Sequence, residues 1–249
     1  MSARNFLISG LIAGLFAGVA AFLVAHTIGE PPVDAAIAVE ASHEHGHHHQ
    51  ENGTVVSREN QSTWGLLTGT MALGPAFGGL AGLAAAGAVG RFGRMRPSQS
   101  TAMVALVAFV AVALVPFLKY PASPPAVGNP DTIGERTDLF FSFLAISVLA
   151  AFAGTVLASR LLPGLGTYRT LVTVVAAYLV VVVVAAQLMP TVNEVGTFPA
   201  QTLWTFRRAS LTTLATMWGT IGVVLVGLVG RAQERTAVEA ARRELAMSL

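Results

Sequence analysis

Six long apolar segments constrain the fold of this chain more than any other feature of its sequence. They cover approximately residues 6–28, 64–89, 101–118, 139–162, 171–189 and 211–229, and none contains Asp, Glu, Lys or Arg except for Arg160. An α-helix of about 20 apolar residues crosses a hydrocarbon core of about 30 Å. Because a spanning helix satisfies its own backbone hydrogen bonds, the sequence predicts an all-α, polytopic transmembrane helical bundle of about six spans.

The composition agrees with a membrane protein and excludes several other classes. The 249-residue chain is 53% hydrophobic and 11% charged, whereas soluble domains carry about 25% charged residues. Its formal charge of +2 comes from basic residues spread over short connections, so we expect the lipid bilayer as a partner and no nucleic acid. It has no cysteine and no phosphate-binding loop, and we expect that it is not an enzyme.

The distribution of basic residues predicts the orientation. Ten of the fifteen fall on one set of alternating connections: Arg4, Arg91, Arg94, Arg96, Arg160, Arg169, Arg231, Arg235, Arg242 and Arg243. Basic residues accumulate on the cytoplasmic side, so both termini are predicted to be cytoplasmic, in a bacterial inner (plasma) membrane. Residues 1–230 then form the transmembrane domain, and residues 231–249 form a cytoplasmic amphipathic tail.

The outer loop predicted at residues 29–63 is rich in histidine. It contains His43, His45, His47, His48 and His49, with Glu44 among them. Neutral imidazole is the commonest side-chain ligand of first-row transition metals. We therefore predict that this tract captures a divalent ion, and imidazoles alone do not distinguish cobalt(II) from nickel, zinc or copper. A solvated low-complexity loop that binds metal incidentally is the alternative.

Three further residues are predicted to receive the ion from this tract. His26 lies at the outer end of the first segment and Glu30 follows four residues later, which puts both on one face if the helix continues. Pro31 disfavours helical geometry at Glu30, so the pair can instead straddle a helix end. Glu40 adds a third candidate ligand before the tract.

Glycines recur at every fourth residue in the first two segments. They are Gly10, Gly14 and Gly18 in the first, and Gly74, Gly78 and Gly82 in the second. Such spacing allows helix backbones to approach closely in lipid. We expect tight packing of these faces.

Two stretches resemble a known family. They are His26–Pro31, followed by Ala36, Ile37 and Glu40, and Pro116–Gly128, followed by Ile133, Arg136 and Thr137. On these stretches the chain resembles the CbtA family, probable cobalt transporter subunits of bacteria. The resemblance implies that the ion is cobalt, and that a small single-span membrane subunit with its own histidines, CbtB, is a partner.

Together these features predict an integral membrane subunit for uptake of a divalent transition metal, with cobalt favoured by the resemblance. Two alternatives stay open. One is a metal-sensing or metal-delivering membrane subunit that transports nothing itself. The other is a structural membrane protein whose histidines are incidental.

Overall fold

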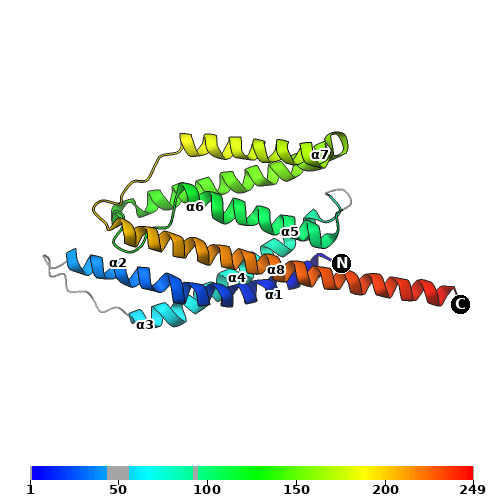
Figure 1. The fold of residues 1–249 in the computed structure, drawn as a ribbon, viewed down its shortest axis with the longest axis horizontal. Helices are drawn as coiled ribbons and strands as arrows, with labels where there is room; N and C mark the ends of the chain where they lie inside the picture. The colour runs from blue at the N-terminus through cyan, green and yellow to red at the C-terminus, as the bar shows by residue number, and fades with distance from the viewer. Residues whose placement is uncertain (1, 44–55, 92–94, 249) are drawn as a thin grey trace.

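The computed structural model describes residues 2–43, 56–91 and 95–248, and every regular element in these ranges is helical. The all-α prediction is confirmed. In chain order the elements are α1 (Ala3–Val24), η1 (Ala25–Gly29), α2 (Glu30–His43), α3 (Arg58–Asn60), η2 (Gln61–Gly65), α4 (Leu66–Ala88), α5 (Pro97–Ala108), η3 (Phe109–Leu114), α6 (Val115–Lys119), η4 (Pro130–Thr132), α7 (Ile133–Leu188) and α8 (Ala200–Met247). Figure 1 shows that the long helices lie side by side in one elongated bundle.

Among the described residues, five helical stretches are long and apolar enough to cross a membrane. They are Ala3–Ser42, Arg58–Ala88, Pro97–Lys119, Pro130–Leu188 and Ala200–Met247. Large apolar side chains on the outside of the bundle, such as Leu149 and Phe152, are about two-thirds exposed. Exposing so many of them to water would oppose folding, since each buried aliphatic or aromatic side chain is worth about 1.5–3 kcal/mol. The surface therefore suits lipid, and these features indicate a multi-pass membrane protein.

The longest helix, α7, folds back on itself. Its 56 residues would form a rod of about 84 Å if straight, far longer than a hydrocarbon core of about 30 Å. Gly166 interrupts it with φ 72° and ψ 171°, and Figure 1 shows the two arms side by side. The hydroxyls of Ser147 and Tyr178 lie 2.9 Å apart across the arms. The arms correspond to the two segments predicted separately, residues 139–162 and 171–189.

The glycine faces of α1 and α4 pack directly against each other, as their spacing predicts. A Cβ added to Gly10 would overlap the carbonyl oxygen of Gly78, and one added to Gly14 would overlap that of Gly74. The pairing runs antiparallel, because residue numbers rise along α1 as they fall along α4. Only glycine permits this backbone contact, which replaces the hydrophobic driving force that is absent between helices in lipid.

A stripe on α8 completes the core of the bundle. Trp218, Ile221, Leu225 and Val229 are buried at spacings of three and four residues, so they share one face of the helix. They belong to the same cluster as buried alanines of α1 and α4, and the Trp218 ring lies 5.6 Å from the Phe77 ring. The small residues of two helices thus accommodate the large residues of a third.

Part of the stretch predicted as an outer loop, residues 29–63, is helical. α2 continues the first helix from Glu30 to His43, and Glu30 itself has helical dihedrals of −64° and −43°. Pro31 and Pro32 have no N–H groups and would clash with carbonyls of the preceding turn. The π-helical turn η1 lies directly before them, and there the Glu30 N–H bonds to the Ala25 carbonyl. A widened turn of this kind accommodates prolines without ending the helix.

The two ends of the bundle carry different elements. The N-terminus, the end of α4, the start of α5 and the turn of α7 lie at one end (Figure 1). The end of α2, the start of α3, the α6–α7 connection and the start of α8 lie at the opposite end. α8 extends beyond the first of these ends as one helix to Met247.

Candidate functional site

His26 is oriented by a hydrogen bond that its ring donates to the neighbouring helical turn. It lies in η1, is exposed, and stacks on the Phe22 ring with centroids 5.6 Å apart. Its Nδ1 is 3.1 Å from the carbonyl oxygen of Ser62. Because that oxygen can only accept, the hydrogen bond requires a proton on Nδ1, so in the neutral ring the lone pair is on Nε2. Metal-binding histidines commonly donate a hydrogen bond from the N–H of their other ring nitrogen to a carbonyl in this way.

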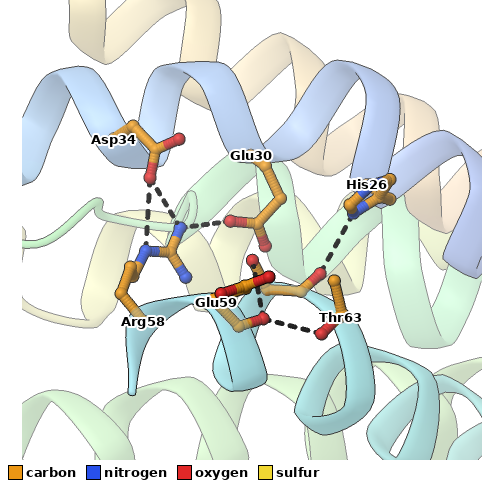
Figure 2. Close-up of polar contacts among 7 residues, drawn as sticks. His26, Glu30, Asp34, Arg58, Glu59 and Thr63 are labelled. Atoms are coloured by element: carbon orange, nitrogen blue, oxygen red, sulfur yellow. Dashed lines mark hydrogen bonds and ion pairs between the residues drawn. The ribbon is translucent and has the colours of Figure 1, made fainter.

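An ion-pair network lies directly beyond His26. The Arg58 guanidinium at the start of α3 bonds to the carboxylates of Glu30 and Asp34 on α2, as Figure 2 shows. Its Nη2 and Nε lie 3.0 and 3.2 Å from Asp34 Oδ1. The Glu30 carboxylate is the more enclosed of the two, with its side chain 15% exposed against 63% for Asp34. Arg58 therefore neutralises the carboxylate that the sequence assigns to a metal.

The structure does not bring the predicted receiving residues together around one point. Glu40 is exposed on α2, ten residues beyond Glu30 and hence about 15 Å further along the helix. Ligands of one transition-metal ion lie about 2 Å from it, so Glu40 cannot share an ion with Glu30 in this arrangement. Within residues 2–43, 56–91 and 95–248, no three His, Asp or Glu side chains are close enough to hold a metal.

The structure describes only the first residue of the histidine tract. His43 is the last residue of α2, and Glu44, His45, His47, His48 and His49 lie outside the described residues. Their role as ligands stays a prediction.

A second polar region, which sequence reasoning missed, lies at the same end of the bundle. Glu194 accepts hydrogen bonds from the Asn129 N–H at 2.8 Å and the Thr132 hydroxyl at 2.9 Å. Arg136 Nε is 3.6 Å from the same carboxylate. These groups hold the pKa of Glu194 below its usual value, with the Asn129 N–H as the largest cause, then the Thr132 hydroxyl, while partial burial opposes them and Arg136 adds to them. One signal was visible, because Glu194 is the only acidic residue in the stretch 190–210.

The stretch Pro116–Gly128 is held in place by these and further long-range bonds. Lys119 Nζ donates to the Met189 carbonyl at 3.2 Å, and the Tyr120 hydroxyl donates to that of Pro190 at 2.8 Å. Gly128 has φ +104°, and a Cβ there would overlap the Arg136 guanidinium. These contacts hold the stretch Pro116–Gly128, which we call the proline-rich cover, against the ends of α7 and α8.

A pocket of about 660 Å³ lies beneath this cover. Its walls come from η3, α6, the first arm of α7 and α8, and its floor includes Phe77 and Trp218. Lys119, Arg136, Glu194 and Arg207 line its polar side.

The family model of the probable cobalt transporter subunit (CbtA) matches residues 3–230. The chain belongs to the CbtA family. No curated protein matches the chain, and no solved structure does. The match includes His26, the Arg58 network and the Glu194 region, whereas residues 231–249 fall outside it. Membership in the CbtA family implies a transporter rather than an enzyme, with cobalt as transported substrate.

Proposed function

We propose that this protein is the membrane subunit through which cobalt(II) is taken up, with its histidine tract facing outward. The match to the family of probable cobalt transporter subunits over residues 3–230 carries this proposal. The five long apolar helices supply the membrane-spanning body that such a function requires.

We propose six crossings with both termini in the cytoplasm of a bacterium. The fold-back of α7 at Gly166 supports six rather than five, since each arm is then one crossing. The N-terminus, the end of α4, the start of α5 and the turn of α7 lie at one end of the bundle. The basic residues predicted to be cytoplasmic flank these elements in the sequence, which agrees with the expected cytoplasmic bias of basic residues. The end of α2, which leads into the tract, then lies outside, at the opposite end of the bundle.

In the proposed order of events, the tract first collects hydrated ions, with Glu40 between the tract and the bundle. The collecting residues are His43, Glu44, His45, His47, His48 and His49. The ion next meets His26, whose Nε2 is the available nitrogen. Binding there together with Glu30 requires the ion to displace Arg58 from the carboxylate. When the Arg58 guanidinium returns to the Glu30 carboxylate, it displaces the metal ion. The ion is then released without protonation of a carboxylate.

The membrane potential can drive the passage. A divalent ion moving inward gains about 4.6 kcal/mol per 100 mV, twice the value for a single charge. The predicted spans contain no Asp or Glu, so a carboxylate proton relay is not part of the proposal. A CbtB-like small subunit is the proposed partner.

One observation favours the second candidate, a metal-delivering subunit that transports nothing alone. The described ranges hold no group of three His, Asp or Glu side chains able to coordinate an ion. A path across the bundle would then have to come from a partner.

Uptake of radioactive cobalt into vesicles containing only the purified full chain tests the proposal. An inside-negative potassium diffusion potential should raise uptake above that of empty vesicles, and reversing the potential should abolish the gain. No uptake at any potential, with uptake restored by a single-span partner, would establish the delivering subunit instead.

The role of the tract is tested by changing its five histidines together, as His43→Ala, His45→Ala, His47→Ala, His48→Ala and His49→Ala. We expect uptake to fall at low cobalt concentration and to recover at high concentration, because a collecting segment only raises the local concentration. Loss at all concentrations would make the tract part of the path.

A further inference from the structure

The pocket beneath the proline-rich cover carries an excess of positive charge. Lys119, Arg136 and Arg207 line it against one carboxylate, that of Glu194. Arg136 is the only one of the three with a carboxylate within 4.0 Å among the described residues. Two cationic side chains thus face the pocket without a matching acid.

These three cationic side chains use only some of their N–H donors in hydrogen bonds to the proline-rich cover and its neighbours. Lys119 uses one of its three N–H donors for the Met189 carbonyl, and Arg207 Nε bonds to the Ala122 carbonyl at 3.4 Å. Arg136 donates from Nη2 to the Asn129 carbonyl, and its buried Nε has no hydrogen-bond partner within the described residues. A guanidinium has five N–H donors, so most remain available to an acidic group.

The rest of the pocket is apolar and aromatic. Phe77, Phe117, Phe140, Phe141 and Trp218 line it. Its volume of about 660 Å³ lies within the usual range of about 300–1,000 Å³ for small-molecule sites. Lys119 and Arg207 lie where α6 and α8 meet their connections, whereas Phe77 and Trp218 lie towards the middle of α4 and α8. This arrangement repels a bare divalent cation and favours an amphiphile with a negative head.

We propose that this pocket binds an anionic amphiphile, with a carboxylate or phosphate at Lys119 and Arg207 and a hydrocarbon body against Phe77 and Trp218. Such a ligand has two sources, an anionic lipid of the bilayer or a free organic acid. The proposal is independent of cobalt transport.

Dodecanoate and dodecanol form the test pair, because they share a hydrocarbon body and differ in charge. In detergent solutions of the full chain, we expect dodecanoate to bind at least about tenfold more tightly, measured by calorimetry. The double variant Lys119→Gln, Arg207→Gln should lose this preference while binding dodecanol unchanged. Arg208→Gln is the matched control, because Arg208 is exposed and does not line the pocket. Equal binding of the two probes, or an equal loss in Arg208→Gln, overturns the proposal.

A second measurement uses no charge substitution, so it tests the proposal even if the double variant does not fold. In a Trp64→Phe, Trp204→Phe background, Trp218 is the only tryptophan. Brominated dodecanoate should quench its fluorescence saturably, and unbrominated dodecanoate should reverse the quenching. Absence of saturable quenching overturns the proposal.

The same signal identifies the source of the ligand. Competition by phosphatidylglycerol but not by phosphatidylcholine, each added in mixed micelles, assigns the pocket to a bilayer lipid. Competition by short-chain organic acids alone assigns it to a free acid.

Discussion

Arg58 does for the carboxylates of α2 what a bound cation would do. It comes from a separate helix and neutralises both Glu30 and Asp34. An exposed ion pair is worth about 0–1 kcal/mol, and this pair is only partly enclosed, so an incoming divalent ion can replace it at small cost. The network therefore suits a site that is occupied only briefly.

Replacing Arg58 should strengthen ion binding beside His26. In a chain whose five tract histidines are changed to Ala, we expect Arg58→Ala to bind cobalt about two- to fivefold more tightly, because up to about 1 kcal/mol of competition is removed. Calorimetry on the purified chain measures this. Arg208→Ala, which also removes one positive charge at this end, should have no effect. Weaker binding in Arg58→Ala would show that Arg58 supports the site rather than competes for it.

Glu194 links the pH to the stability of the cover. Its pKa is lower in the folded chain than in the unfolded chain because the Asn129 N–H and the Thr132 hydroxyl bond to the ionised form. The resulting stabilisation is present above the unfolded pKa of about 4.3 and is lost as the pH falls through the folded pKa. Glu194→Gln should therefore lower Tm by a few degrees at pH 7, and the difference from the unaltered chain should disappear in acid. Thermal unfolding in detergent over a series of pH values is the measurement, and a difference in Tm that does not shrink as the pH is lowered would contradict this account.

At the scale of elements, the contact between α1 and α4 depends on the absence of side chains. Backbone of one helix occupies the space that a Cβ on the other would need, at Gly10, Gly14, Gly74 and Gly78. Neither backbone can move aside as a flexible side chain could. The helices must therefore separate if either gains a methyl group.

Gly14→Ala should destabilise the bundle by about 1–3 kcal/mol, the usual cost of overpacking. Gly69→Ala is the control, because Gly69 lies in α4 and has no atom within 4 Å of an added Cβ; alanine there should be neutral or slightly stabilising. Denaturant titration in mixed micelles compares the two. Equal stability of both variants would contradict the packed geometry.

α1, η1 and α2 illustrate how a helix passes through a proline pair. The π-helical turn accommodates two prolines that lack N–H donors. His26, Glu30 and Glu40 therefore lie on one continuous helical rod. That rod spaces the predicted ligands along the axis rather than gathering them. Any transfer between them is a sequence of steps.

For the whole molecule, the chain's lack of cysteine makes its topology directly measurable with single cysteines. Ser42→Cys and Ser123→Cys should react with a membrane-impermeant maleimide in intact cells, because both are exposed at the proposed outer end. Tyr168→Cys and Ser248→Cys should react only after permeabilisation. Labelling of Ser248→Cys in intact cells would contradict the cytoplasmic C-terminus of the proposed topology.

Much of the architecture could be predicted because its causes are local. Hydropathy alone identified the apolar helices, and the four-residue glycine spacing identified the faces of α1 and α4 that touch. The sequence could not show that Glu30 is already paired, because Arg58 lies 28 residues away. Nor could it show that Glu194 joins the proline-rich cover, since those bonds link residues more than 60 positions apart.

The sequence by itself determined that the chain forms apolar helices, because backbone hydrogen bonds in lipid must be satisfied within each segment. It also supplied the family likeness and the residues predicted to bind a transition metal. Only the tertiary structure decided that Glu30 is paired with Arg58, that His26 Nδ1 is hydrogen-bonded, and where a cationic pocket forms. Those outcomes depend on pairs of side chains from distant segments, whose proximity exists only after the helices have packed.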